Sequence, residues 1–249
     1  MRLVFLHGGL HTGGCWDQTL AAISELRPNL DVFAVDLPGR RHLEADLATL
    51  TLDDCAAAVV RQIDDSGGAG RDDGEEVVLV GHSLAGVVMA RVVDRLRRQR
   101  PVQVVFVACC VPAKGRCVVD ALPIALRPVV RHLTQRSPVI APPKSLLRYA
   151  FGNHATAVQR ACITDGIVPE SSALLLEPVV FGFPRSVPKS WILTSRDRAL
   201  PPRQQRRSIR NVGGVDRVAV IDAAHEVMIT HPHELAATVL SLCEAAARR

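Results

Sequence analysis

One stretch of eleven residues restricts the fold of this chain more than any other. The run Glu76–Gly86 begins with mostly β-branched apolar residues and ends in Gly-His-Ser-Leu-Ala-Gly, and an apolar helical pattern follows at once. It predicts a buried strand, a sharp turn and a helix, with Ser83 at the apex. Gly81 and Ala85 flank that serine two residues away on either side, where larger side chains would clash. This pattern is typical of a turn that exposes a nucleophilic hydroxyl, and an ordinary strand-to-helix turn is the alternative.

Short apolar runs alternate with amphipathic stretches along most of the chain. Near-continuous runs of Val, Ile and Leu are typical of parallel strands that are buried on both faces. The alternation of strand and helix predicts an α/β fold with a doubly wound, mostly parallel sheet. The expected strands are 3–6, 32–35, 77–80, 102–108, 190–194 and 217–221, and the expected helices are 16–26, 52–64, 84–98, 201–211 and 232–246.

One long segment breaks this alternation. Residues 111–185 contain nine prolines and short helical pieces such as Lys144–Phe151 and His154–Cys162. The segment is too long for a plain loop, and its apolar content argues against a disordered linker. We expect residues 1–110 and 186–249 to form an α/β core and residues 111–185 to form a small helical cap. Ligands of open α/β sheets bind at the carboxyl ends of the strands, so this cap would roof the site.

The chain also provides partners for a nucleophilic serine. A serine hydroxyl needs an adjacent base, and the base needs an acid that orients it. With a serine turn of this kind, the chain order is serine, acid, histidine. Asp197 and His225 each lie just past the carboxyl end of an expected strand. The sequence therefore predicts that Ser83, Asp197 and His225 are catalytic. Asp222 is a weaker candidate for the acid because it nearly adjoins His225 in the chain.

Attack of Ser83 on a carbonyl would create an oxyanion, which needs N–H donors that are already in place. One donor is expected from Leu84, because the first amides of a helix have no partner within it. The other is expected from the glycine-rich loop His7–Trp16 after the first strand, with Gly9 preferred and Leu10 second. A phosphate-binding loop is excluded there because no Gly-Lys-Ser/Thr follows.

Several further residues are expected to contact the substrate. They come from the glycine-rich loop, from the serine turn and from the cap, and they are Leu10, His11, His82, Leu146, Tyr149, Phe151, His154 and Phe181. The apolar character of the cap indicates a small or medium apolar acyl or alcohol group. Because a serine, histidine and aspartate supply both nucleophile and base, we expect no cofactor and no metal.

The composition limits the partners and the location of the protein. No apolar run reaches the ~18 residues that would span a bilayer, and the N-terminal run is too short for a signal peptide. The seven cysteines include no Cys-x-x-Cys pair, which favours reduced thiols in the cytoplasm. The net charge is +5, but aromatic residues make up only 4%, which argues against nucleic-acid binding. We expect a cytoplasmic protein, monomeric or homodimeric, with a small-molecule ester as substrate.

These motifs, in this order, resemble the α/β-hydrolase superfamily, and within it the small-lid branch of plant methyl-ester esterases and hydroxynitrile lyases. In the superfamily the cap follows the sixth-strand position, and the same placement is implied for this chain. Its start directly at the His-Gly-Gly strand resembles this branch, which lacks the superfamily's leading antiparallel strands. The resemblance covers nearly the whole chain and rests on His7-Gly8-Gly9, Trp16, Asp36–Arg40, Gly81–Gly86, Asp197-x-x-Leu-Pro and Ala224-His225.

Several residues of this chain differ from those of this branch, and the differences argue against some of the reactions known in the superfamily. The lyases carry a lysine directly after the catalytic histidine, where this chain has Glu226, and a threonine where it has Gly8. Both differences argue against cyanohydrin cleavage. Dehalogenases and epoxide hydrolases of the superfamily use an aspartate nucleophile, which Ser83 excludes. The esterases usually have Asp or Gly before the histidine, where this chain has Ala224.

The residues and the resemblance together imply a serine hydrolase that forms an acyl-enzyme from a carboxylic ester, a thioester or a lactone. Two alternatives stay open. One is a lyase, cyclase or cofactor-free oxygenase that uses the same histidine as a base. The other is a ligand-binding protein without catalysis on the same scaffold, because one fold hosts many functions.

Overall fold

A six-stranded parallel sheet forms the centre of this computed structural model, which describes residues 1–66, 74–180 and 182–247. The strand order is β2-β1-β3-β4-β7-β8, and all neighbouring strands run parallel. The chain begins in the sheet interior, adds β2 on one side and then continues outward on the other. The strands are β1 (Arg2–Leu6), β2 (Asp31–Val35), β3 (Val77–His82), β4 (Val102–Val107), β7 (Lys189–Thr194) and β8 (Arg217–Ile221).

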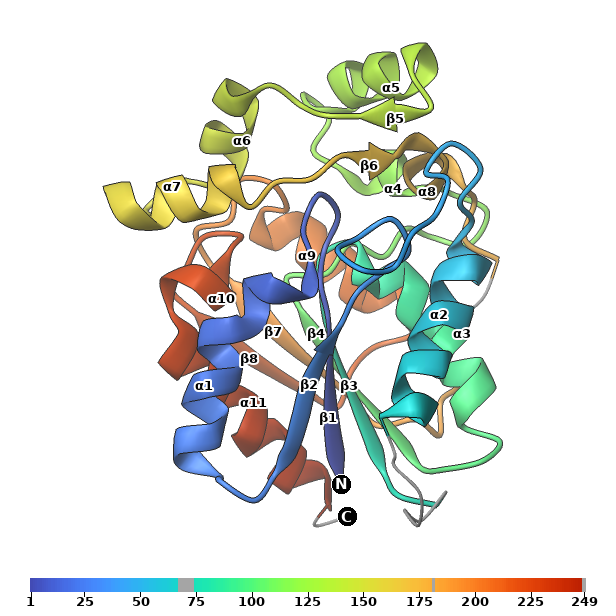
Figure 1. Ribbon diagram of the computed structural model, residues 1–249, viewed down its shortest axis with the longest axis vertical. Helices are drawn as coiled ribbons and strands as arrows, with labels where there is room; N and C mark the ends of the chain where they lie inside the picture. The colour runs from blue at the N-terminus through green and yellow to red at the C-terminus, as the bar shows by residue number, and fades with distance from the viewer. Residues whose placement is uncertain (67–73, 181, 248–249) are drawn as a thin grey trace.

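Helices cover both faces of this sheet, which confirms the predicted doubly wound α/β fold (Figure 1). One face is covered by α1 (Asp17–Leu26), which the 3-10 turn η1 (Gly13–Trp16) precedes, and by α10 (Val227–Thr230) and α11 (Pro232–Ala247). The other face is covered by α2 (Leu52–Asp65), α3 (Ala85–Leu96) and α9 (Pro202–Asn211).

The two faces hold two separate hydrophobic clusters. In β1, Val4 and Leu6 belong to the cluster under α2 and α3, whereas Leu3 and Phe5 belong to the cluster under α1 and α11. All four side chains are fully buried. Since successive side chains of a strand point to opposite faces, a strand that is apolar at every position is stable only where both faces are covered. This is why continuous apolar runs identified the strands correctly.

Residues 111–185 lie between β4 and β7 in the chain and extend across the carboxyl ends of the strands, away from both termini (Figure 1). β4 is the fourth strand of the sheet in chain order. The segment contains the helices α4 (Val118–Ala121), α5 (Arg127–Arg136), α6 (Lys144–Ala150), α7 (Ala157–Asp165) and α8 (Ser172–Leu176).

The segment also contains an antiparallel pair of short strands, β5 (Val139–Ile140) and β6 (Glu170–Ser171). The sequence predicted only helices in this region. Two-residue strands are too short to show any periodicity, so this pairing leaves no signal in the sequence. It matters for the site because it fixes Glu170, a residue of the pocket wall.

Three further properties of the fold concern its cysteines, its helices and its arginines. All seven cysteines are free thiols. Within the described parts of the chain, no helix is both long enough and apolar enough to cross a membrane. The arginines of α9 at positions 203, 206, 207 and 210 are all exposed and form one solvated face of that helix.

Candidate active site

Ser83 lies at a tight turn between β3 and α3. Its φ of +51° is in the left-handed region, which non-glycine residues seldom adopt. Hydrogen bonds hold the backbone in this conformation: the Ser83 amide donates to the Val107 carbonyl at 3.2 Å, and the Ser83 carbonyl accepts from the amides of Gly86 at 3.1 Å and Cys110 at 2.9 Å. A strained backbone conformation of this kind persists only where contacts with the surrounding structure hold it. Such conformations are common at functional sites.

Small residues make the turn sterically possible. A Cβ atom on Gly81 would lie 2.5 Å from the Met89 sulfur and 3.1 Å from the Ala85 Cβ, so a larger residue would force both neighbours to shift. A Cβ atom on Gly8 would lie 2.8 Å from His82 Nδ1 and would also crowd the serine. The steric reason inferred from the sequence is therefore present, and the Met89 side chain reinforces it.

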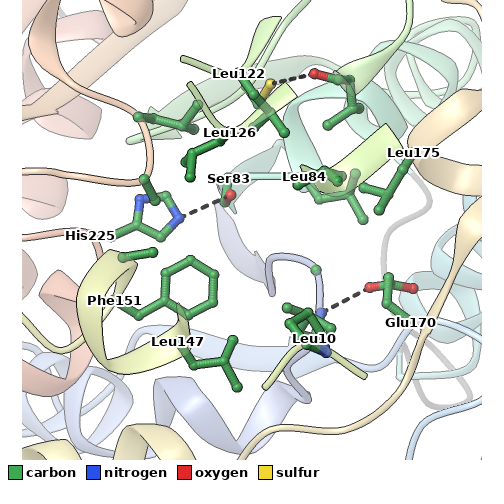
Figure 2. Close-up of a pocket in the computed structure, with 18 of the residues that line it drawn as sticks. Leu10, Ser83, Leu84, Leu122, Leu126, Leu147, Phe151, Glu170, Leu175 and His225 are labelled. Atoms are coloured by element: carbon green, nitrogen blue, oxygen red, sulfur yellow. Dashed lines mark hydrogen bonds between the residues drawn. The ribbon is translucent and has the colours of Figure 1, made fainter. Parts of the chain in front are cut away.

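A chain of hydrogen bonds joins Ser83, His225 and Asp197. His225 Nε2 lies 3.1 Å from Ser83 Oγ (Figure 2), and His225 Nδ1 lies 2.7 Å from Asp197 Oδ2. The three residues follow β3, β8 and β7, so they meet at the same edge of the sheet. Because the carboxylate only accepts, Nδ1 carries the hydrogen, and the lone pair of Nε2 faces the serine hydroxyl.

The Asp197 carboxylate is fully buried and held on both oxygens. Its Oδ1 accepts from the Leu200 amide at 2.7 Å. Its Oδ2 accepts from Thr194 Oγ1 at 3.1 Å and from Gln205 Nε2 at 3.3 Å, in addition to the imidazole of His225. These donors fix the carboxylate in the orientation that the imidazole needs. Gln205, a buried residue of α9, was not identified from the sequence.

The charges around His225 favour its protonated form. Burial lowers the pKa of this imidazole, but the negative charge of Asp197, the hydrogen bond to it and the charge of Glu226 outweigh burial. The pKa of His225 is therefore raised above its ordinary value. This arrangement stabilises an imidazolium at this position.

Three buried polar residues lie behind His225, and we call them the rear cluster: His11, His82 and Glu226. Each is at most 3% exposed. His82 Nε2 lies 3.1 Å from the carbonyl oxygen of His225, and the two rings are 4.6 Å apart. His11 Nε2 lies 3.5 Å from Glu226 Oε2. The rear cluster therefore contacts both the backbone and the electrostatic surroundings of His225.

His82 and Glu226 of the rear cluster, together with His225, do not fit a metal site. His82, His225 and Glu226 place ligand atoms within 4.8 Å of one another, which is a compatible spacing. Both nitrogens of His225, however, face hydrogen-bond partners, Ser83 and Asp197. Burial, with the neighbouring histidines His225 and His11, holds the pKa of His82 well below its usual value, so this imidazole is neutral. A neutral His82 donates its Nε2 hydrogen to the His225 carbonyl and so positions that backbone.

Two backbone amides beside Ser83 are available to a ligand. Gly9 and Leu84 are in close contact, since a Cβ atom on Gly9 would lie 3.3 Å from Leu84 Cδ2, and both line the same pocket as the serine. Among the described residues, no acceptor is bonded to either amide. The Leu10 amide, by contrast, donates to Glu170 Oε2 at 2.8 Å (Figure 2). Of the two candidates in the glycine-rich loop, the geometry favours Gly9.

An apolar pocket opens beside Ser83 and His225 (Figure 2). Its volume is about 140 Å³. Most of its wall comes from the segment 111–185, and the core adds Gly9, Leu10, Leu84, Cys110, Ala199 and Leu200. Among the described lining residues, Glu170 is the only acidic one. The pocket therefore places hydrocarbon around the serine hydroxyl.

The residues expected to contact substrate divide into three groups. Leu10, Leu146 and Phe151 line the pocket. Tyr149 is 56% exposed with the Arg198 guanidinium over its ring, and His154 is also exposed, so neither lines it. Leu146, Leu147 and Ala150 of the same helix, α6, do line the pocket. His11 and His82 lie in the rear cluster instead of the pocket wall, and Phe181 lies outside the described residues.

Comparison with known proteins agrees with this architecture. The family model described as Alpha/beta hydrolase family matches residues 3–238, and the chain belongs to this family. It is similar to the probable esterase PIR7A of Oryza sativa subsp. indica, with 25% identity over 97% of this chain and 96% of the rice protein. It is also similar to methylesterase 7 of Arabidopsis thaliana, with 24% identity over 98% of this chain and 96% of that protein. These similarities place it in the plant methylesterase-like branch.

A solved structure shows the same fold over almost the whole chain. It is an extracellular α/β-hydrolase from a Paenibacillus species, described as sharing structural and functional homology with tobacco salicylic acid binding protein 2. The TM-score is 0.81 at 21% identity, and the match covers 97% of this chain and 98% of the other. At this level of identity the likeness concerns the fold.

Proposed function

We propose that this protein is a serine hydrolase that cleaves a small or medium carboxylic ester, with thioesters and lactones as related substrates. The observation that carries the proposal is the hydrogen-bonded chain Ser83–His225–Asp197, which ends on an apolar pocket. Esterase-type relatives support ester hydrolysis in general. The triad, the acyl-enzyme and the substrate are our inference for this chain.

The proposed reaction begins with attack of Ser83 Oγ on the substrate carbonyl carbon while His225 Nε2 takes up the hydroxyl proton. The carbonyl oxygen becomes an oxyanion, which accepts hydrogen bonds from the amides of Gly9 and Leu84. His225 then donates its proton to the leaving alkoxide, so the alcohol departs and an acyl-Ser83 ester is left. Asp197 keeps the imidazole in the required tautomer throughout.

Deacylation repeats the sequence with water as the nucleophile. His225 takes a proton from the water as its oxygen attacks the acyl carbon, and the Gly9 and Leu84 amides again hold the oxyanion. The proton then returns to Ser83 Oγ as the carboxylic acid is released. The protein's own groups thus supply every proton transfer in both halves of the reaction.

The pocket limits the group that the enzyme accommodates. An apolar protein cavity of roughly 150 Å³ holds a benzene molecule, and the pocket of this protein has a volume of about 140 Å³. Apart from Ser83, His225, Cys110 and Glu170 its wall is hydrocarbon, so a charged acyl group bound there would lose most of its hydration without compensation. We propose an uncharged apolar acyl or alcohol group of about that size, and a cap role for residues 111–185. The free thiols fit a reducing compartment such as the cytoplasm.

The test combines active-site labelling with turnover. A fluorophosphonate probe should label Ser83, and p-nitrophenyl acetate and butyrate should be hydrolysed. Ser83→Ala should remove labelling and lower kcat by at least about 10³-fold. Full esterase activity in Ser83→Ala would exclude the mechanism. Labelling without turnover of any ester would favour a non-hydrolytic reaction on the same residues, and saturable ligand binding without labelling would favour a non-catalytic protein.

A further inference from the structure

Two side chains that are distant in sequence, Glu170 and Arg40, bind the loop that carries Gly9. Leu10 has a φ of +67°, a left-handed conformation that costs a leucine energy. The Leu10 amide donates to Glu170 Oε2 at 2.8 Å (Figure 2), and the Leu10 carbonyl accepts from the Val168 amide at 2.8 Å. The next carbonyl, that of His11, accepts from Arg40 Nε at 3.0 Å. Consecutive peptide groups of the loop are thus fixed by other parts of the chain.

Glu170 and Arg40 also bind each other. Arg40 Nη2 donates to Glu170 Oε1 at 2.7 Å, and both side chains are almost completely buried. Glu170 Oε1 accepts in addition from the Ser171 amide at 2.9 Å. The carboxylate therefore faces three donors: two on Oε1 and the Leu10 amide on Oε2. Arg40 follows β2 and Glu170 lies in β6, so the pair joins the core to the segment 111–185.

We propose that Glu170, oriented by Arg40, is a positioning residue that holds the Gly9 amide in place for the oxyanion. This inference rests on the proposed function of Gly9. The Gly9 N–H belongs to the peptide group between Gly8 and Gly9, whose carbonyl oxygen lies 2.7 Å from His7 Nδ1. Glu170 fixes the next peptide group, between Gly9 and Leu10, which cannot rotate without breaking the bond from the Leu10 amide. Glu170 Oε2 lies close to Gly9 itself, 3.2 Å from where a Cβ atom would stand. A donor that is slightly misplaced loses much of its effect on the transition state.

A second glutamate of the same segment provides a matched control. Glu177 Oε1 accepts from Arg91 Nη2 at 2.6 Å, and its Oε2 accepts from the Leu52 amide at 2.8 Å. It therefore makes the same kind of contact, one arginine and one backbone amide, between the segment and the core. Its amide partner begins α2 instead of belonging to the glycine-rich loop, and Glu177 does not line the pocket.

The experiment compares Glu170→Gln with Glu177→Gln in the full-length protein. A glutamine has one acceptor oxygen, and Arg40 will attract it, so the NH₂ group is left facing the Leu10 amide, which is also a donor. We expect kcat for p-nitrophenyl butyrate to fall about 10- to 100-fold at unchanged KM. We also expect faster amide hydrogen exchange in a peptide covering residues 7–16. Glu177→Gln should change neither quantity.

The outcomes separate this inference from the proposed function. Unchanged kcat and unchanged exchange in Glu170→Gln would overturn it, as would an equal loss of kcat in both glutamine variants. If the unaltered protein hydrolyses no ester but its loop still exchanges faster in Glu170→Gln alone, the proposed function fails and the positioning contact stands. Should Glu170→Gln not fold, Arg40→Lys replaces it. That variant keeps the charge but loses the separate donor to His11, and an unchanged kcat would equally contradict the inference.

Discussion

The two sides of His225 differ in polarity. On the pocket side, side chains such as Leu147, Phe151 and Leu200 surround the serine hydroxyl with hydrocarbon. On the other side, the rear cluster of His11, His82 and Glu226 consists of buried polar groups that the pocket does not reach. The pocket side sets what fits next to the serine, and the polar side sets the charge and orientation of the imidazole. In the proposed reaction, different residues would therefore control shape selection and proton transfer.

The largest effect should come from Asp197, the acid that orients the imidazole of His225. Asp197→Asn would leave the shape almost unchanged but would favour the wrong tautomer of His225, because an amide NH₂ cannot accept from Nδ1. We expect kcat for p-nitrophenyl butyrate to fall about 10⁴-fold. The matched control is Asp222→Asn, an exposed residue paired with Arg196 on the surface. An equal loss of activity in both variants would mean that Asp197 is not the orienting acid.

A smaller effect should come from the pocket side. Leu147→Phe adds volume to the buried wall and so narrows the pocket. We therefore expect kcat/KM for p-nitrophenyl butyrate to fall about tenfold relative to kcat/KM for p-nitrophenyl acetate. The pH dependence of kcat/KM should not move, since no charge changes. Tyr149→Phe, on the exposed face of the same helix, should leave both quantities unaltered. A shifted pH profile in Leu147→Phe would show that the two sides of His225 are coupled.

The smallest effect should come from the rear cluster. Glu226→Gln removes a negative charge that helps to raise the pKa of His225. Because attack requires the neutral imidazole, a lower pKa moves the acid limb of kcat/KM towards lower pH. The same change makes His225 a weaker base, so we expect kcat at high pH to fall by less than about tenfold.

The control for this charge is Glu244→Gln, which removes a surface carboxylate paired with Arg27. It should leave the pH profile in place. The ratio of butyrate to acetate turnover should stay constant in both variants, because neither residue lines the pocket. An acid limb that moves to higher pH in Glu226→Gln would mean that the charge of Glu226 does not raise the pKa of His225.

The sequence predicted the parts of the fold that depend on local patterns. Continuous apolar runs identified all six strands of the sheet, and the small residues around Ser83 identified the turn, because sterics there act within a few positions of the chain. Chain order was enough to select Asp197 and His225, which the structure brings together at 2.7 Å.

Contacts between distant segments could not be predicted in this way. Glu170 meets Leu10 across 160 positions, and Gln205 meets Asp197 from α9, a helix that carries no residue of the predicted site. Tyr149 was expected in the pocket as a residue of the cap, but its side chain is exposed. Its orientation and the contact of Glu170 both depend on how residues 111–185 pack on the core.

The segment 111–185 supplies most of the pocket wall and also binds the glycine-rich loop through Glu170. This combination has a consequence for protein engineering. Exchanging this segment for that of a relative is an obvious way to obtain a new pocket, because most of the wall comes from it. The same exchange would also remove the carboxylate that binds the Leu10 amide and neutralises Arg40. A graft without an acidic residue at the position of Glu170 would leave a buried guanidinium uncompensated. A successful chimaera should therefore keep Arg40 and Glu170 together, as an ion pair taken from one parent protein.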